Sequence, residues 1–141
     1  MDRRRFVELT AGALAAAGLP GCASLVATPV TPVNGAVRLP IRNYPQLEHP
    51  GGYLKIMPAG QSTPLYVLVL ADGEFSVVSS VCTHLQCTVN VEGPRLLCPC
   101  HGSMYDRAGR VLRGPAERPL RRFPAATSVE GELVIQLGTA S

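Results

Sequence analysis

Two cysteine- and histidine-rich segments decide the fold of this chain: CTHLQC at residues 82 to 87 and CPCHGSMYD at residues 98 to 106. Each segment follows a short apolar run, so each is expected to form a tight loop at the end of a β-strand. The first segment holds a Cys-x-His pair, and the second holds a Cys-x-x-His pair. Because two thiolates and two imidazoles make a metal-binding donor set, the pattern predicts one metal site built from two loops.

Zinc and an iron-sulfur cluster are the two candidate occupants of this site. Two cysteines and two histidines would bind Zn²⁺ as a tetrahedron. Zinc sites usually separate paired ligands by about two to four residues, however, whereas Cys82 and His84 are closer together. A four-ligand zinc site would also leave Cys87 and Cys100 unexplained. The spacing therefore favours an iron-sulfur cluster over zinc.

Residues 82 to 115 resemble the cluster-binding region of the Rieske [2Fe-2S] family, especially the members from quinol-oxidising cytochrome bc-type complexes. The resemblance implies one [2Fe-2S] cluster, in which two cysteines bind one iron and two histidines bind the other. These ligands are Cys82 and Cys98 for the first iron, and His84 and His101 for the second. The resemblance also implies a disulfide bond between Cys87 and Cys100 that clamps the two loops together.

The resemblance also concerns the reduction potential of the cluster. Ser103 and Tyr105 occupy positions where the family carries hydroxyl donors to a bridging sulfide and to a ligand-cysteine sulfur. Such donors stabilise the more negative, reduced cluster. Potentials of Rieske centres run from about −150 to about +300 mV. The resemblance therefore implies a potential in the upper part of this range.

Three hypotheses describe how a chain of this kind is used. The first is one-electron transfer as the iron-sulfur subunit of a quinol:cytochrome c reductase-like complex, with Leu85, His84 or His101 contacting quinol. The second is a stand-alone periplasmic electron carrier, or the small subunit of an arsenite-oxidase-like oxidoreductase. The third is a zinc-binding structural module. None gives the chain independent catalysis, and the first two require a redox partner protein such as a cytochrome.

One residue in the first loop departs from the family pattern. Gln86 stands where members from bc-type complexes generally carry glycine. It lies beside Leu85, on the part of the loop that would enter a quinol pocket. This departure weakens the first hypothesis and favours an independent carrier.

Residues 1 to 22 are predicted to be an export signal. A charged start, DRRRFVE at residues 2 to 8, precedes an uncharged run rich in Ala, Leu and Gly. Residues 3 to 6 resemble the core of a twin-arginine signal. Residues 19 to 22, LPGC, resemble a lipobox, so Cys22 is a candidate lipidation site. An uncleaved membrane anchor and a simply cleaved signal are the alternatives. The domain is expected in the bacterial periplasm or on the outer face of the cytoplasmic membrane, tethered to it.

The rest of the chain is expected to be one all-β domain, a small antiparallel sandwich or barrel with a two-loop cluster-binding subdomain. The chain has 141 residues, the size of a single domain, and its 14 Gly, 13 Pro and absent Trp favour short strands joined by turns. Residues 23 to 35 are expected to form a tether, residues 36 to 141 the domain, and residues 80 to 118 or so the cluster-binding subdomain.

Six apolar runs are predicted to be strands. They cover residues 36 to 41, 53 to 58, 65 to 70, 74 to 80, 95 to 99 and 132 to 137. Asp72-Gly73 separates two of these runs and predicts a hairpin turn.

The net charge of +3 is only mildly basic. Part of it comes from the arginines of the predicted signal, and no RNP, zinc-finger or helix-turn-helix pattern is present, so no nucleic acid partner is expected. Six arginines fall between Arg107 and Arg122. They are expected to form a solvated charged surface, with a docking face near the cluster as the alternative.

Overall fold

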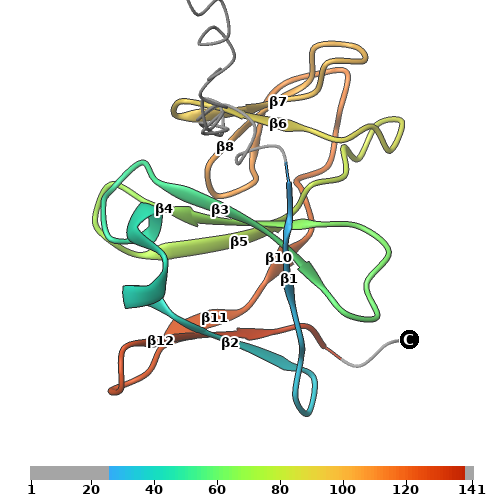
Figure 1. Cartoon of the computed structure of the whole chain (residues 1–141). Coiled ribbons are helices and arrows are strands. Elements are labelled where there is room, and N and C mark those ends of the chain that lie inside the picture. The colour runs from blue at the N-terminus through green and yellow to red at the C-terminus, as the bar shows by residue number, and fades with distance from the viewer. Residues whose placement is uncertain (1–25, 139–141) are drawn as a thin grey trace, which may run out of the picture.

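The computed structural model describes residues 26 to 138, which form three β-sheets lying one above another (Figure 1). The expected export signal and Cys22 lie outside these residues. The expected all-β class is confirmed, because the helical elements of the described part are two short 3-10 turns, η1 (Ile41–Asn43) and η2 (Pro45–Leu47). Within residues 26 to 138, no helix is both long enough and apolar enough to span a bilayer.

The sheets contain five, three and four strands. The middle sheet is formed, in spatial order, by β1 (Thr28–Val30), β3 (Tyr53–Pro58), β4 (Leu65–Val69), β5 (Phe75–Ser79) and β10 (Arg122–Phe123). The lower sheet contains β11 (Ala125–Thr127), β12 (Glu132–Gln136) and β2 (Ala36–Pro40). The upper sheet contains β6 (Asn90–Glu92), β7 (Arg95–Leu97), β8 (Met104–Asp106) and β9 (Val111–Arg113). All neighbouring strands are antiparallel except β1, which is parallel to β3.

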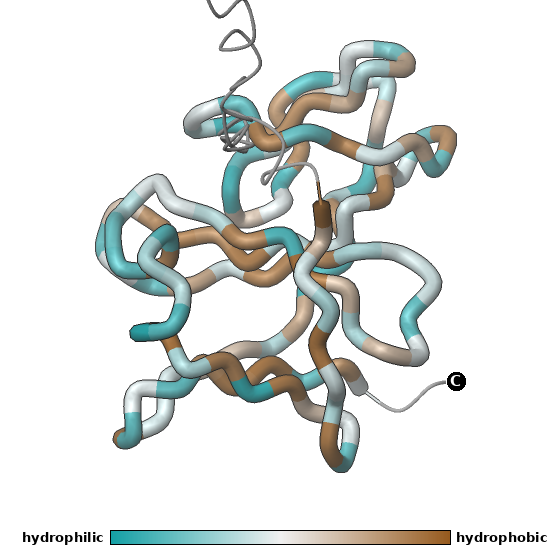
Figure 2. The backbone as a smooth tube through the Cα atoms, viewed as in Figure 1, coloured by the Kyte–Doolittle hydropathy of each residue, from teal (hydrophilic) through white to brown (hydrophobic). Residues whose placement is uncertain are grey.

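Strand β4 connects two hydrophobic cores, because all of its residues are buried. Successive side chains of a strand point to opposite faces of the sheet. Leu65, Val67 and Val69 accordingly pack into a core shared with the lower sheet. Tyr66 and Leu68 pack on the other face into a core shared with the upper sheet. This explains why β4 is a continuous apolar run, seen as a hydrophobic stretch in Figure 2.

The upper sheet is a single excursion of the chain. It leaves from the end of β5 and returns at β10, and these two strands pair with each other in the middle sheet. We call residues 80 to 121 the small subdomain, and the middle and lower sheets the base. Because the excursion starts and ends on neighbouring strands, both ends of the small subdomain join the base side by side, and its core packs on one face of the middle sheet.

The six predicted strands are confirmed as β2, β3, β4, β5, β7 and β12, each within a few residues of the expected bounds. The turn at Asp72-Gly73 joins the antiparallel strands β4 and β5. Gly73 has a φ of 81°, and the carboxylate of Asp72 accepts the backbone N–H of Glu74 at 3.1 Å. Both residues therefore have the turn role that the sequence predicts.

The expected tether over residues 23 to 35 differs from the structure. Thr28–Val30 forms β1, which pairs with β3 in the register Thr28↔Ile56 to Val30↔Pro58. Val30 also packs against the lower core. A proline is compatible with this position because β1 lies at the sheet edge, where one side of the strand needs no ladder hydrogen bonds. The folded sheet thus includes part of the segment expected to be a linker.

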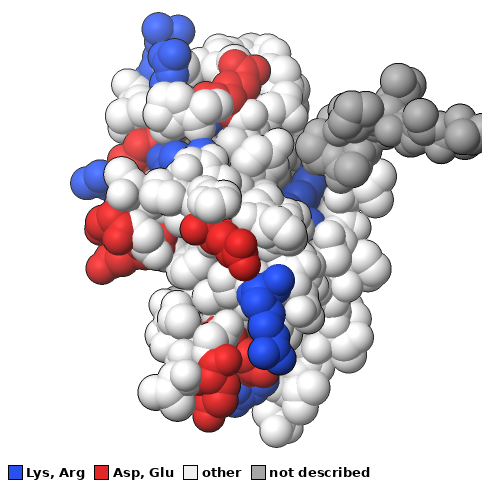
Figure 3. Space-filling model, turned by 60° about the vertical axis from the view of Figure 1, so that its left-hand side comes forward, with Lys and Arg blue, Asp and Glu red and all other residues white. Residues whose placement is uncertain are grey.

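The surface of the chain carries both signs of charge. On the face shown in Figure 3, Lys and Arg side chains lie among Asp and Glu side chains. Two ion pairs occur in the described part of the chain, Arg38 with Glu132 and Arg110 with Asp106.

Candidate metal centre

The two loops of the small subdomain close in the same way. In the first, the N–H of Cys82 donates to the carbonyl of Cys87 at 2.7 Å, and the N–H of Gln86 donates back to the carbonyl of Cys82 at 3.0 Å. In the second, Cys98 donates to the carbonyl of Ser103 at 2.8 Å, and Gly102 donates back to Cys98 at 3.0 Å. The same offsets recur, so the two leading cysteines occupy equivalent positions.

The equivalence extends to the backbone dihedrals. Gln86 and Gly102 hold the same position in their loops, and both have positive φ, at 60° and 78°. Glycine adopts this conformation without steric cost, whereas glutamine does so at some cost. The structure therefore gives a conformational reason why glycine suits the position of Gln86.

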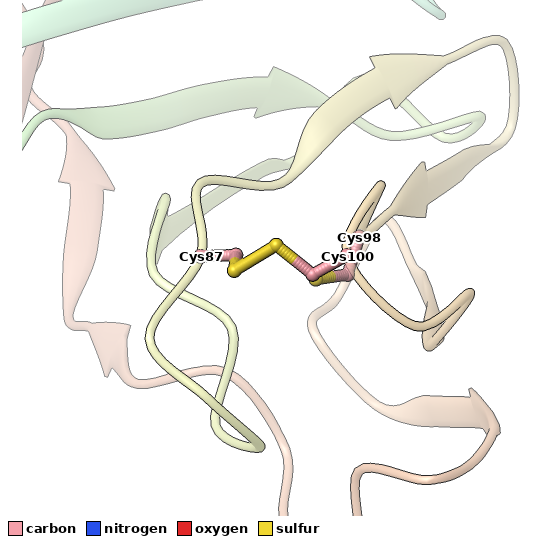
Figure 4. Close-up of side chains that lie close together, drawn as sticks. All are labelled: Cys87, Cys98 and Cys100. Carbon is pink, nitrogen blue, oxygen red and sulfur yellow. A yellow bond between two sulfur atoms is a disulfide. The ribbon is translucent and has the colours of Figure 1, made fainter.

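A disulfide bond between Cys87 and Cys100 joins the two loops (Figure 4). The sulfur of Cys98 lies within 4.8 Å of both sulfurs of this bond. These three cysteines are not a set of metal ligands, because only a thiolate binds metal and two of the sulfurs are consumed in the bond. The free thiols of the described residues are Cys82 and Cys98.

Two thiols and two imidazoles lie on the two loops that the disulfide joins. Cys82 is fully buried and Cys98 nearly so, with 0% and 2% of their surfaces exposed. His84 and His101 are exposed, and their ring centroids lie 5.2 Å apart. The loops therefore provide an inner pair of sulfur donors and an outer pair of nitrogen donors, a set that fits a cluster with cysteine on one iron and histidine on the other.

Hydrogen bonds prepare one of the two thiols for binding metal. Burial raises the pKa of the Cys82 thiol, but the Tyr105 hydroxyl, the His84 and Leu85 backbone and the Cys98 side chain together lower that pKa below its usual value. Burial and the neighbouring Cys82 thiol raise the pKa of Cys98 above its usual value, and the backbone of Cys100 and His101 lowers that pKa by less. The hydrogen bonds from Tyr105 and from the loop backbone therefore favour a thiolate at Cys82, the form of cysteine that metals bind.

Tyr105, on β8, reaches the first loop from the core. Its hydroxyl oxygen lies 3.2 Å from the sulfur of Cys82 and 3.2 Å from both the backbone nitrogen and the hydroxyl oxygen of Thr83. The Thr83 N–H donates to Tyr105, and the Thr83 hydroxyl donates to the carbonyl of Arg118 at 2.7 Å. The Tyr105 hydrogen is therefore left for the Cys82 sulfur or the Thr83 oxygen. Burial raises the pKa of Tyr105, so the phenol keeps this hydrogen.

Ser103, the second residue expected to tune the potential, is fully buried at the end of the second loop. Its hydroxyl oxygen accepts the N–H of Ala116 at 3.0 Å, and Ala116 directly follows Gly114-Pro115. This bond joins the second loop to the segment that follows β9. It uses an oxygen lone pair and leaves the hydroxyl hydrogen available to donate.

The residues expected to contact quinol lie at the exposed tip. Leu85 is 57% exposed between His84 and Gln86, which are also exposed. One residue of the site, Thr83, was not identified by sequence reasoning. Its position between two ligand candidates was the available signal, but its partners lie 22 and 35 residues further along the chain.

Comparison with known proteins places these loops in a family. The family model described as the Rieske [2Fe-2S] domain matches residues 40 to 124. The cytochrome b6-f complex iron-sulfur subunit of Synechococcus sp. (strain WH7803) is 40% identical over 91 residues, which cover 61% of this chain and 49% of the relative. The chloroplastic subunit 1 of Nicotiana tabacum is 42% identical over 72 residues, covering 48% of this chain and 32% of that protein. The chain thus spans about half the length of the first of these relatives, and less of the second.

Solved structures of Rieske proteins and their complexes are also similar to this chain. The plasma membrane Rieske protein PetC3 of Synechocystis PCC 6803 superposes with a TM-score of 0.53 at 31% identity, covering 60% of this chain and 85% of that one. A chain of a hyperthermophilic respiratory Complex III superposes with a TM-score of 0.54 at 24% identity, covering 68% of this chain and 71% of that one. This likeness is one of fold.

Proposed function

Because the chain belongs to the Rieske [2Fe-2S] domain family, we propose that it transfers single electrons at high potential as the iron-sulfur subunit of a quinol-oxidising complex. Its cofactor is one [2Fe-2S] cluster, and it is an electron carrier similar to iron-sulfur subunits of cytochrome b6-f complexes. Its proposed partners are quinol and a cytochrome.

The proposed ligands are those that the loops bring together: Cys82 and Cys98 for one iron, and His84 and His101 for the other. The observation that carries this assignment is the pairing of two buried free thiols with two adjacent exposed imidazoles. When bound, the cluster supplies a centre that gains and loses one electron. The disulfide between the loops holds both ligand pairs in place, and burial of the thiols excludes water from the inner side.

The exposed tip supports the quinol hypothesis. Each imidazole has a second ring nitrogen that can hold or pass a proton at the surface. Leu85 adds an apolar contact of the kind that a quinone ring requires. Together these side chains would orient quinol against the tip and receive its hydroxyl hydrogen bond.

An electron paramagnetic resonance spectrum of the reduced full chain tests the ligand assignment. We expect an average g value below that of clusters with four cysteine ligands, and zinc would give no signal. Changing His84→Cys should move the spectrum towards the all-cysteine type if the cluster still assembles. A zinc content equal to the protein content, with no signal, would contradict the proposal.

Substitution of two exposed leucines distinguishes quinol oxidation from electron transfer between proteins. Leu85 and Leu112 are similarly exposed, at 57% and 55%, but Leu112 lies on β9, outside the ligand loops. In membranes containing the full chain, Leu85→Ala should slow cluster reduction by quinol severalfold, whereas Leu112→Ala should not. Equal rates in both variants would contradict a quinol contact at the tip.

A stand-alone periplasmic carrier is the second candidate, and Gln86 favours it. Its exposed side chain stands at the tip beside Leu85, where it would obstruct a close-fitting pocket. If this candidate holds, Gln86→Gly will leave electron transfer to a soluble acceptor unchanged and will not create quinol-dependent reduction.

We also propose that the domain works on the outer face of the cytoplasmic membrane or in the periplasm, tethered to the membrane through its N-terminal segment. The disulfide supports this location, because such bonds persist in oxidising compartments. The similar protein of Synechocystis is described as a plasma membrane protein. The test is to fractionate cells that produce the chain with Arg3 and Arg4 either unchanged or replaced, and to compare where the protein is found.

A further inference from the structure

Charge is unevenly divided between the small subdomain and the rest of the described chain. Residues 80 to 121 hold six arginines against three acidic residues, a balance of +3. Residues 26 to 79 and 122 to 138 hold four basic against five acidic residues, a balance of −1. The face in Figure 3 shows both signs of charge. The excess positive charge of the small subdomain depends on how each of its arginines is paired.

Two of the arginines are committed to the fold. Arg107 donates to the carbonyls of Gly93 and Gly52, at 2.7 and 2.6 Å. Arg110 forms an ion pair with Asp106 at 2.8 Å. The guanidinium groups of both arginines are therefore already bound to partners within the chain.

Arg118 and Arg121 are different, because both are exposed and neither forms an ion pair with any residue between 26 and 138. Their backbones are fixed: the carbonyl of Arg118 accepts the Thr83 hydroxyl at 2.7 Å, and the carbonyl of Arg121 accepts the N–H of Ser79 at 2.8 Å. The Arg121 guanidinium lies over the ring of Phe123, 4.8 Å from its centroid. The backbone of both arginines is thus fixed, the Arg121 guanidinium also contacts Phe123, and neither side chain has an acidic partner among the described residues.

Both arginines line a hollow of about 340 Å³ beside the first loop. Cys82, Thr83 and Gln86 of the first loop also line it. A group seated in this hollow would lie beside Arg118 and Arg121, whose guanidinium groups suit a carboxylate. It would also lie against the segment that carries a proposed ligand of the cluster.

We propose that this hollow is the docking site for an acidic surface of a protein redox partner, whose carboxylates pair with Arg118 and Arg121. The inference rests on the proposed electron transfer and adds the face through which it occurs. One electron passes from the reduced protein to the partner, and no bond is made or broken. The positive charge attracts the acidic partner from a distance, and the hollow fixes its position beside Cys82.

Charge reversal tests the proposal in the full chain loaded with its cluster. The variant Arg118→Glu with Arg121→Glu is compared with Arg38→Glu with Arg42→Glu, two exposed arginines of the base. Both doubles change the net charge equally. Arg118→Lys with Arg121→Lys keeps the charge but loses the planar guanidinium groups. Thermal unfolding of each variant checks that it is folded.

The first measurement is the rate constant for oxidation of the reduced protein by hexacyanoferrate(III) and by tris(phenanthroline)cobalt(III) at low ionic strength. Reversal at the hollow should slow the anionic oxidant by about tenfold and speed the cationic one, while reversal at the base changes either rate by less than about twofold. The lysine variant should retain the rates of the unchanged protein. Equal effects of both reversals would overturn the inference, because total charge would then be the cause.

The second measurement is binding of a fluorescein-labelled deca-glutamate peptide, followed by anisotropy at low salt. The unchanged protein and the base variant should bind it, and the variant reversed at the hollow should not. Equal binding by all three would overturn the docking site. If neither oxidant removed an electron from a protein that shows the cluster spectrum, the proposed electron transfer would fail, and this inference with it.

Discussion

At the scale of single residues, the immediate surroundings of Cys82 decide how the site behaves. The Tyr105 hydroxyl and the Thr83 hydroxyl form a chain that ends at the Arg118 carbonyl. Because the Thr83 hydrogen is committed to Arg118, the Tyr105 hydrogen is directed to the sulfur or to the Thr83 oxygen. This chain connects a buried core residue on β8 with the loop that carries two proposed ligands.

Replacement of this tyrosine tests the proposed tuning role. We expect Tyr105→Phe to lower the midpoint potential by about 40 mV, since a donor worth about 1 kcal/mol to the reduced state shifts a one-electron couple by that amount. The measurement is a redox titration followed by electron paramagnetic resonance. Tyr66→Phe is the control, because Tyr66 also donates a buried hydrogen bond, to the carbonyl of Val89 at 2.8 Å, but not to a ligand. An equal shift in both variants would show that lost stability, and not the sulfur contact, is responsible.

The sequence was informative at this scale because the chemistry is local. The four ligand candidates and the disulfide cysteines lie within two short segments, and the structure brings the segments together. Thr83 was missed because its importance depends on Tyr105 and Arg118, which only the fold places beside it.

At the scale of elements, the site consists of two equivalent loops joined by one covalent bond. Each loop turns at a position with positive φ, filled by Gln86 in the first and Gly102 in the second. The sequence shows two metal-binding segments but not their equivalence, because one loop has glycine at the turn and the other has not.

Substitutions at the two turn positions, Gly102 and Gln86, should change the free energy of unfolding in opposite directions. Gly102→Ala should lower the free energy of unfolding by about 1 kcal/mol, because a side chain is strained at positive φ. Open space surrounds this position, with no atom within 4 Å of the added Cβ, so the effect reports the backbone alone. Gln86→Gly should raise the free energy of unfolding by up to about 1 kcal/mol. Urea unfolding of both variants is the measurement, and destabilisation by Gln86→Gly would contradict the argument.

The covalent bond between the loops should account for more stability than either turn. We expect Cys87→Ser with Cys100→Ser to lower the free energy of unfolding by about 3 kcal/mol, because the bond closes a loop across a sequence separation of 13 residues. Thermal unfolding and the iron content after purification measure the outcome. Removing both cysteines leaves no stray thiol to compete for iron. Unchanged stability and iron content would show that the bond is dispensable.

The predicted strands also show the limits of the sequence at this scale. Runs of five or six apolar or alternating residues predicted β2, β3, β4, β5 and β12, and the apolar run at residues 95 to 99 predicted the three-residue β7. The missed strands have two or three residues each: β1, β6, β8, β9, β10 and β11. Such short strands show too little alternation to be detected, and their pairing partners determine them.

At the scale of the whole molecule, the small subdomain must be held firmly on the base if the ligand pairs are to keep a fixed orientation towards partners. Several side chains bridge the boundary, among them Tyr66 and Arg107. Tyr66 of β4 donates to the carbonyl of Val89, and the half-buried guanidinium of Arg107 joins the carbonyl of Gly52 in the base to that of Gly93 in the upper sheet. Burial lowers the pKa of Arg107, but the group remains a cation at any physiological pH.

Removal of the Arg107 guanidinium should therefore weaken the junction of the two parts. We expect Arg107→Ala to lower the free energy of unfolding by about 2 kcal/mol, because two carbonyls lose a charged donor. The control is Arg110→Ala, which removes an ion pair whose arginine side chain is 77% exposed and should cost less than about 0.5 kcal/mol. Urea unfolding compares the variants, and hydrogen exchange then locates the change. Faster exchange in the upper sheet than in the lower sheet would follow from a loosened junction, whereas equal losses in both variants would assign Arg107 to ordinary surface charge.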